Sequence, residues 1–263
     1  MAIKPRVFVT VRDTKRPQRA KSPYIDSCFE AMEVIGSVYI NSQIPSSSGL
    51  GSSAAVTVAT LSAINDEFRM NKTREDIANM AFEIEKKVQK GRASPTDTTV
   101  SAYGGIVLIS GGSRRRLPPQ NMHLVIGDSL ISHSTARMVE QVGELKNNYP
   151  NIVDPVLDAI EGVSMSAIHY LSNPRELGRY MNMNHALLEV LGVGHPQLAK
   201  MVLAARDAGA FGAKITGAGG GGCMVALCPK PLKHRIAGAI EACNARAIVT
   251  GIDTEGVRKE KNV

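Results

Sequence analysis

Five glycines occupy the six positions from Gly217 to Gly222, and two short apolar segments, 213–216 and 223–227, flank them. The apolar segments have the composition of strands, so the glycine run is expected to join two strands of one sheet. A flexible hairpin tip is one interpretation, but a tight turn requires only one or two glycines. Because glycine lacks a Cβ atom, we favour a run that comes close to a ligand or to another backbone segment.

A second glycine-containing segment, Pro45 to Ala55, contains two glycines and five serines. It follows an alternating segment, 37–44, and precedes a long helical pattern at 52–68, so the predicted order is strand, glycine loop, helix. Free N–H groups and the positive dipole end at a helix N-terminus bind phosphate oxygens, and serine hydroxyls can contact phosphate or Mg²⁺. The segment therefore predicts a binding site for a nucleoside triphosphate. The alternative is an ordinary serine-capped helix, which would need only one capping serine and one glycine.

The loop does not belong to the Walker class of ATPases. No glycine loop in the chain ends in Gly-Lys-Ser or Gly-Lys-Thr, and the segment Gly209 to Lys214 lacks a hydroxyl residue after its lysine. A candidate acid lies elsewhere, at Asp97 in the sequence Ser-Pro-Thr-Asp-Thr, which we expect to form a turn between a helix and a strand. There Asp97 could meet a substrate hydroxyl, although the same pattern also occurs in ordinary Asx turns.

Composition limits the classes of partner. A net charge of +7 favours anionic ligands, whereas 4% aromatic residues and no tryptophan provide few stacking surfaces for single-stranded nucleic acid. The basic run Arg114 to Arg116 is interpreted as a solvated loop crest. No apolar stretch is long enough for a membrane span or resembles a signal peptide. We therefore expect a cytoplasmic protein that binds neither nucleic acid nor membrane, with a homodimer as a candidate assembly.

Periodicity and length predict two domains of α+β type, at 1–119 and 120–263. Near the C-terminus, the order strand, glycine turn, strand, helix, strand favours an α+β layer over a parallel wound sheet. Further helices are predicted over 24–34, 74–90, 134–145, 152–172, 174–190, 197–208 and 232–243, and further strands over 7–11, 103–110, 122–126 and 247–252.

The glycine segments and the Asp97 turn resemble the GHMP kinases, and among them the archaeal type of mevalonate kinase. The second family motif, P-x-G-x-G-L-G-S-S-A, resembles residues 45–54, with Ser47 where the motif has glycine. The third motif, K-I-T-G-A-G-G-G-G-C, matches Lys214 to Cys223 without a mismatch. The Asp97 turn, preceded by Glu85, and the closing Thr254-Glu255-Gly256 resemble the same subgroup. The similarity extends from about Ser22 to the C-terminus.

The resemblance implies a role for each matched residue. Asp97 is the implied catalytic residue, and Ser53 and Glu85 are the implied Mg²⁺ ligands, with Glu83 as a rival because the spacing to Asp97 is one residue longer than usual. The implied ATP-binding residues are Ser48, Gly49, Leu50, Gly51, Ser52, Ser53, Ala54, Gly217, Ala218 and Gly219. The implied substrate-binding residues are Thr98, Ser134, Thr135 and Ala218.

The resemblance also implies a fold and a reaction. The fold is a two-domain GHMP kinase with an N-terminal ribosomal protein S5 domain 2-like layer and a C-terminal ferredoxin-like layer. The reaction is ATP-dependent phosphorylation of mevalonate to 5-phosphomevalonate in isoprenoid biosynthesis. The alternatives are a kinase for another small hydroxy acid or for phosphomevalonate, and a nucleotide-binding homologue with impaired catalysis. The first family motif, P-G-K/R-x-x-L-x-G-E-H-A, is absent, from which we expect a late start site or a truncated chain.

Overall fold

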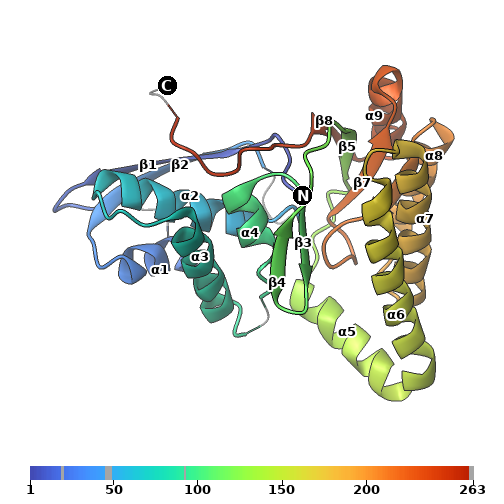
Figure 1. Ribbon diagram of the computed structural model, residues 1–263, viewed down its shortest axis with the longest axis horizontal. Coiled ribbons are helices and arrows are strands. Elements are labelled where there is room, and N and C mark those ends of the chain that lie inside the picture. The colour runs from blue at the N-terminus through green and yellow to red at the C-terminus, as the bar shows by residue number, and fades with distance from the viewer. Residues whose placement is uncertain (19–20, 45–48, 92, 261–263) are drawn as a thin grey trace. The chain divides into compact units, whose positions relative to one another are not determined.

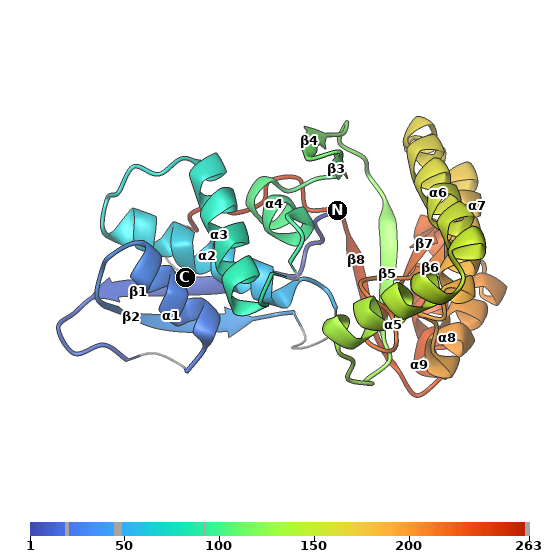
Figure 2. The same ribbon diagram turned by 90° about the horizontal axis from the view of Figure 1, so that it is seen from below.

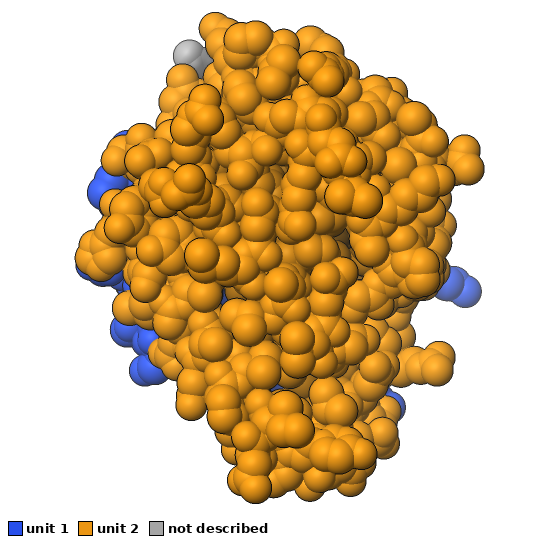
Figure 3. Space-filling model, turned by 90° about the vertical axis from the view of Figure 1, so that its right-hand side faces the viewer, with its two compact units in different colours: residues 1–46, 51–119, 252–263 blue, residues 47–50, 120–251 orange. Residues whose placement is uncertain are grey.

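The computed structural model describes residues 1–18, 21–44, 49–91 and 93–260. By internal packing the chain divides into two compact units, coloured blue and orange in Figure 3. Unit 1 comprises residues 1–46, 51–119 and 252–263, and unit 2 comprises residues 47–50 and 120–251. The domain limits 1–119 and 120–263 stay a prediction, since compact packing does not test which segment folds independently.

Unit 1 is built on a two-stranded antiparallel ribbon, with helices against one of its faces (Figures 1 and 2). Its first elements are β1 (Val7–Asp13), α1 (Pro23–Ala31), β2 (Gly36–Ser42), α2 (Ser52–Glu67) and α3 (Arg74–Val88). The strands pair from Val7 opposite Ser42 to Asp13 opposite Gly36. Helix α3 starts at a capping box in which Thr73 and Asp76 bond each other's backbone N–H groups. The core contains Leu61 and Ile64 of α2, both fully buried.

The segment after α3 differs from the sequence-based prediction. Residues Thr96–Tyr103 form helix α4 rather than a turn, and the following strand β3 is only Val107–Ser110. The Oγ atom of Ser94 accepts a hydrogen bond from the N–H of Thr96 at 3.2 Å, so a short Ser-Pro sequence starts the helix. Gly104 follows α4 with a φ of 69° and a ψ of −176°, a conformation that favours glycine and in which the helix cannot continue. Asp97 therefore lies in the first turn of a helix.

The basic run is part of a strand instead of a loop crest. Residues Ser113–Arg116 form β4, which pairs antiparallel with β3 from Ser110 opposite Ser113 to Val107 opposite Arg116. The turn lies at Gly111 and Gly112, whose φ angles are 54° and 78°. Because every residue of β4 is exposed, the strand has no apolar alternation by which a sequence pattern could reveal it.

The closing Thr254-Glu255-Gly256 motif serves the packing of unit 1. Asp253 accepts hydrogen bonds from the N–H groups of Glu255 and Gly256 at 3.0 and 2.9 Å, and it pairs with Arg6. Gly256 has a φ of 70° and packs closely against Gly104, where a side chain at either position would meet backbone. The glycine of this motif is therefore explained by close packing of two backbone segments.

Unit 2 contains a four-stranded antiparallel sheet in the order β6-β7-β5-β8. Its elements are β5 (His123–Asp128), α5 (Thr135–Asn148), α6 (Pro150–Ala167), α7 (Pro174–Val190), α8 (Pro196–Asp207), β6 (Gly212–Ile215), β7 (Cys223–Cys228), α9 (Lys233–Glu241) and β8 (Arg246–Gly251). The succession β5-α8-β6-β7-α9-β8 with this strand order is the ferredoxin-like arrangement. The predicted ferredoxin-like layer is confirmed, and α5, α6 and α7 are inserted between its first strand and first helix.

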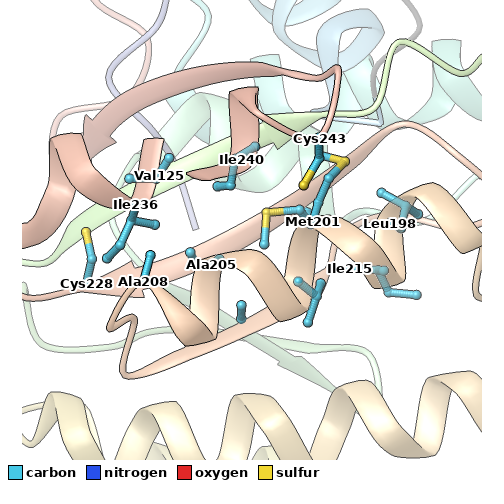
Figure 4. Close-up of a cluster of buried hydrophobic side chains, with 14 of the residues drawn as sticks. Val125, Leu198, Met201, Ala205, Ala208, Ile215, Cys228, Ile236, Ile240 and Cys243 are labelled. Atoms are coloured by element: carbon cyan, nitrogen blue, oxygen red, sulfur yellow. The ribbon is translucent and has the colours of Figure 1, made fainter. Parts of the chain in front are cut away.

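The core of unit 2 lies between the sheet and helices α8 and α9 (Figure 4). Met201 of α8 and Ile236 and Ile240 of α9 are fully buried there, and burial of each such side chain contributes roughly 1.5–3 kcal/mol. The edge strand β6 is fixed at Ala213, whose N–H donates to Asn182 at 3.0 Å and whose carbonyl accepts from Arg206 at 2.7 Å. The outer edge of the strand that leads into the glycine run is therefore bonded to α7 and α8. Within the described part of the chain, no helix is long and apolar enough to cross a membrane.

Candidate active site

Helix α2 begins directly after the first glycine loop. Gly51 is its N-cap residue, with φ 69° and ψ 29°, and no side chain of the described residues caps this end. Ser52, Ser53 and Ala54 form the first turn, whose N–H groups are available to a ligand. Gly49 and Leu50 precede it, whereas Pro45 and Ser48 lie outside the described residues. The helix start that was predicted to bind phosphate is thus present and uncapped by these residues.

Two acidic residues of unit 1 lie near this helix start. The Oγ atom of Ser53 donates a hydrogen bond to Oε1 of Glu85 at 2.7 Å. A Cβ atom built on Gly51 would lie 3.2 Å from Oδ2 of Asp97. Glu85 is only 4% exposed, whereas its rival Glu83 is exposed on α3 and lies 3.9 Å from the Lys86 ammonium. The structure therefore brings Ser53, Glu85 and Asp97 together and leaves Glu83 apart.

The sequence of α3 explains why Glu85 is buried. Ala78 and Ala81 precede it at spacings of seven and four residues, on the same side of the helix, and both are fully buried. Small side chains in this row allow α3 to pack closely on α2, and Glu85 ends the row opposite Ser53. The sequence contains the spacing of Ala78, Ala81 and Glu85, but the packing of α3 on α2 shows that this side of the helix is buried.

Burial raises the pKa of both carboxyl groups. For Glu85, burial is the larger cause and the nearby charge of Asp97 adds to it, while the hydrogen bond from Ser53 acts in the opposite direction. Asp97 retains accessible surface, yet the protein atoms that surround its carboxyl group partly desolvate it and raise its pKa. Among the described residues, no lysine or arginine lowers the pKa of either group, but the positive amino group of Met1 partly offsets the rise at Asp97. Within the described part of the chain, the two carboxyl groups therefore have no basic side chain that acts on their pKa values.

This charge arrangement fits a divalent cation. Mg²⁺ binds through one or two carboxylates and takes its remaining ligands from water and substrate phosphates. Glu85 and the hydroxyl of Ser53 supply suitable oxygen atoms, and a bound cation would offset the repulsion between Glu85 and Asp97. The described residues contain no group of three or more histidine, cysteine, aspartate or glutamate side chains that could hold a metal alone. A Mg²⁺ site that takes its remaining ligands from a bound phosphate agrees both with the oxygen atoms of Ser53 and Glu85 and with the lack of a larger ligand cluster among the described residues.

Thr98, predicted to bind substrate, uses its hydroxyl within α4. Its side chain is fully buried, and Oγ1 donates to the carbonyl of Pro95 at 3.3 Å. This bond closes the first turn of α4, the turn that carries Asp97. In this structure Thr98 therefore holds the helix start, while the neighbouring Asp97 keeps accessible surface.

In unit 2, the glycine run separates into two parts with different surroundings. Gly217 is exposed, and a Cβ atom built on it would lie 3.1 Å from the carbonyl oxygen of Gly49. Residues 219–222 form hydrogen bonds with other loops of unit 2: the N–H of Gly220 donates to the carbonyl of Val193 and that of Gly222 to the carbonyl of Ile131, both at 2.9 Å. Close approach to another backbone, one of the two predicted reasons for the run, is confirmed for this second part. Gly217 and Ala218 remain the part that is open to a ligand.

The start of α5 contains the last two predicted substrate residues. Ser134 is the N-cap residue, and its Oγ atom accepts from the N–H of Arg137 at 3.4 Å. Both Ser134 and Thr135 are exposed. The adjacent His133, which sequence reasoning missed, lies against Gly49, where an added Cβ atom would be 3.3 Å from its Cε1. In the sequence, His133 stands directly before the predicted helix 134–145, and this position was the only indication of a role at the site.

Comparison with known proteins identifies the family. The model of the GHMP kinase N-terminal domain matches residues 23–105, and that of the GHMP kinase C-terminal domain matches residues 165–245. The mevalonate kinase of Thermococcus sibiricus is 42% identical over 230 residues, covering 85% of this chain and 68% of the relative. The mevalonate kinase of Pyrococcus abyssi is 40% identical over 232 residues, covering 86% of this chain and 69% of the relative.

Solved structures support the same fold. The mevalonate kinase of L. major in complex with R-mevalonate aligns with a TM-score of 0.84 at 23% identity, covering 96% of this chain and 87% of that chain. The Methanococcus jannaschii mevalonate kinase aligns with a TM-score of 0.78 at 24% identity, covering 96% of this chain and 90% of that chain. At these identities the likeness confirms the predicted two-domain fold, and the more similar sequences establish the family. The chain belongs to the GHMP kinases, and its relatives from Thermococcus sibiricus and Pyrococcus abyssi are mevalonate kinases.

Proposed function

We infer that the protein catalyses transfer of the γ-phosphoryl group of ATP to the 5-hydroxyl of mevalonate. The observation that carries this inference is the cluster of Ser53, Glu85 and Asp97 at the uncapped start of α2. It occurs in a chain that is 42% identical to a mevalonate kinase over 85% of its length. Formation of 5-phosphomevalonate assigns the protein to isoprenoid biosynthesis, which we place in the cytoplasm.

Asp97 is proposed to act on the acceptor hydroxyl. The hydroxyl oxygen attacks the γ-phosphorus, the bond from this phosphorus to the bridging β-oxygen breaks, and ADP leaves with the electron pair. The hydroxyl proton passes to the Asp97 carboxylate and then to solvent. A pKa raised by burial makes Asp97 a better proton acceptor than an ordinary aspartate, although it must still be ionised before the transfer.

Binding of the triphosphate is assigned to the first glycine loop and the start of α2. The N–H groups at the helix start and the hydroxyls of Ser52 and Ser53 are suited to phosphate oxygens. Ser53 and Glu85 would hold Mg²⁺, which when bound neutralises charge on the phosphates. Glu85 depends on Ser53 for its orientation, because the 2.7 Å hydrogen bond fixes one of its two oxygens.

Unit 2 is proposed to contribute backbone and hydroxyl contacts. Gly217, Ala218 and Gly219 are assigned to ATP, and Ser134, Thr135 and Ala218 to the acceptor. This assignment follows the family motif, and the exposed positions of Gly217, Ser134 and Thr135 allow it. Thr98 is assigned to the acceptor with less structural support, because its hydroxyl bonds Pro95.

Substitution of Asp97 tests the proposal. Asp97→Asn keeps the shape of the side chain but removes the proton acceptor, so we expect kcat to fall by roughly 10²–10⁴ while MgATP affinity stays close to that of the parent. The measurement is 5-phosphomevalonate formation by the purified protein, together with nucleotide titration. Asp26→Asn, at an exposed carboxylate on α1, is the matched control and should leave both quantities unchanged.

Two results would contradict parts of the proposal. An Asp97→Asn protein as fast as its parent would remove Asp97 from the chemistry. A parent protein that binds MgATP but phosphorylates no hydroxy acid would replace the kinase with a nucleotide-binding homologue. Parallel assays with phosphomevalonate and other small hydroxy acids decide among acceptors by comparison of kcat/KM.

A further inference from the structure

A groove of about 540 Å³ lies within unit 2, between the start of α5 and the loop that joins α7 to α8. Arg137, Gln141 and His195 lie on its walls and take no part in the proposed phosphoryl transfer. The residues that line the groove are Ser132, His133, Ser134, Arg137, Met138, Gln141, Gly192, Gly194, His195 and Gly220. Its volume falls in the range of small-molecule sites, which is roughly 300–1,000 Å³.

Hydrogen bonds hold the walls of the groove together. The Nε2 atom of Gln141 on α5 donates to the carbonyl of Gly192 at 3.2 Å. The N–H of Gly220 in the glycine run donates to the carbonyl of Val193 at 2.9 Å. Three segments that are distant in sequence are therefore tied to one another around the groove, so the opening is formed before any ligand binds.

The lining of the groove is basic. It includes Arg137 and two histidines, and none of its residues is acidic. The guanidinium of Arg137 forms no ion pair or hydrogen bond with the described residues. Its backbone N–H donates a hydrogen bond to Oγ of Ser134. The nearby Glu189 has its carboxylate 3.5 Å from Nε2 of His185, so that carboxylate is directed to another partner. A guanidinium that faces a groove without a carboxylate is available to an external anion.

The two histidines supply further donors. At the N-cap of α8, the Nδ1 atom of His195 accepts a hydrogen bond from the N–H of Gln197 at 3.1 Å. Nδ1 is therefore the unprotonated nitrogen of the neutral ring, which places the hydrogen on Nε2 and makes that atom a donor. His133 has a buried Nδ1 atom that forms no hydrogen bond with the described residues. Its ring has capacity for a ligand that the protein itself leaves unused.

We propose that this groove binds an oxyanion group, a phosphate or a carboxylate, of a small organic molecule, with Arg137 and His195 as its principal donors. A cation is disfavoured because Arg137 would repel it, and a purely apolar ligand would leave three basic side chains without partners. The volume exceeds that of a lone phosphate, so an organic part can lie along Met138 and the two glycines of the α7–α8 loop. Ser134, on the wall of the groove, is also assigned to the acceptor, so competition of mevalonate with the probe would place the probe in the acceptor site and overturn the proposal.

Isothermal titration without nucleotide or Mg²⁺ tests the proposal. The probes are inorganic phosphate, glycerol 3-phosphate and the matched carboxylate glycerate, each to about 10 mM, a range that detects dissociation constants near 1 mM. We expect saturable binding of at least one probe. Arg137→Gln should weaken that binding tenfold or more, because it removes the charge-assisted hydrogen bonds of the guanidinium. The stronger of the phosphate and carboxylate probes identifies the anion class.

Matched variants test whether the probe binds in this groove. His195→Asn keeps an N-cap side chain on α8 while it removes the ring, and it should also weaken binding. Arg235→Gln removes the same charge from an exposed position on α9 and should leave binding unchanged. Absence of saturable binding, or equal weakening by Arg235→Gln, would overturn the proposal.

A separate control tests whether the probe occupies the nucleotide site instead of the groove. Repeating the titration with a saturating nonhydrolysable MgATP analogue should leave the binding of the probe in place. Loss of binding under that condition would mean that the probe occupies the phosphate loop, which would overturn the groove assignment. Failure of the kinase assay, by contrast, would leave these titrations unaffected.

Discussion

The two glycine-rich segments of this protein use the same residue for different physical reasons. At Gly51, an added Cβ atom would meet the side chain of Asp97, 3.1 Å from its Cγ. At Gly220 and Gly221, it would meet Met138 at 2.5 Å and the backbone oxygen of Ile131 at 2.7 Å, and at Gly219 it would overlap the carbonyl of Val193. In unit 1 the missing Cβ leaves space beside the Asp97 carboxylate, whereas in unit 2 it allows segments of the chain to pack closely. A high glycine content therefore does not by itself identify ligand contacts.

Alanine substitution at both loops tests this difference, and we expect its largest effect at Gly219. Gly219→Ala places a Cβ atom against a carbonyl that cannot move independently, at a φ of 79°, so the free energy of unfolding should fall by roughly 2–4 kcal/mol. Gly51→Ala should cost only about 1 kcal/mol, the strain of a left-handed alanine, because the Asp97 side chain can move away from the added Cβ atom. Denaturant unfolding measures both changes.

Activity should rank the two variants in the opposite order. Gly51→Ala displaces Asp97 and obstructs the start of α2, so turnover per folded molecule should fall more than in Gly219→Ala. Gly143→Ala, where an added Cβ atom has open space, is the control and should preserve both stability and turnover. If Gly51→Ala were the less stable and Gly219→Ala the less active variant, the comparison between the loops would be wrong.

Buried charge gives a second contrast between the units. Burial lowers the pKa of Lys214, on the strand before the glycine run, to about 8, whereas Glu85 and Asp97 of unit 1 have raised pKa values. Between about pH 8 and its ordinary value of 10.5, the unfolded chain binds more protons at Lys214 than the folded chain. The lysine therefore destabilises the folded protein at neutral pH, and this cost decreases as the pH rises through that window.

Lys214→Met should remove this dependence. At pH 7 we expect the variant to be more stable than the parent by about 1–2 kcal/mol, less than the pKa alone implies because the 2.7 Å hydrogen bond to Ile215 is lost. The difference in free energy of unfolding should shrink between pH 8 and 10. Lys200→Met, at an exposed position on α8, should show no such pH dependence. A constant difference across this range would show that Lys214 is not the group responsible.

Strong local signals allowed most of the fold to be predicted. Helix α7 has the predicted limits, 174–190, and the structure shows strong local signals there: Asn173 caps the helix and Pro174 is its first residue. The strand, loop and helix order around Gly51 was also correct. Strand β4 was missed because all four of its residues are exposed, and α4 was missed because a Ser-Pro-Thr sequence was interpreted as a turn. Both failures concern short elements, one fully exposed and one of eight residues with only a few apolar side chains.

The candidate site was predicted in part. The motif identified Ser53, Glu85 and Asp97, but the choice between Glu85 and Glu83 required the structure, since both lie on α3 and only packing decides which is buried. His133 and the groove at Arg137 were not predicted, because they depend on contacts between segments distant in sequence. Spacing along a helix can predict which residues share a face, but not what that face contacts.

Glu85→Gln gives the smallest expected change in stability and links it to function. The folded-state pKa of Glu85 is raised above its ordinary 4.5, so ionised Glu85 makes the fold less stable than protonated Glu85 does. The cost is absent below pH 4.5 and is present in full once the pH exceeds the folded-state pKa. At pH 7 the ligand-free variant should therefore be the more stable, by up to about 1 kcal/mol or a Tm increase of roughly 2–4 °C, while Glu83→Gln should change little. MgATP should raise the Tm of the parent and of Glu83→Gln, but much less that of Glu85→Gln, because the variant lacks the charge that would hold Mg²⁺. Equal protection of both variants would remove Glu85 from the metal site and leave its burial as a structural feature alone.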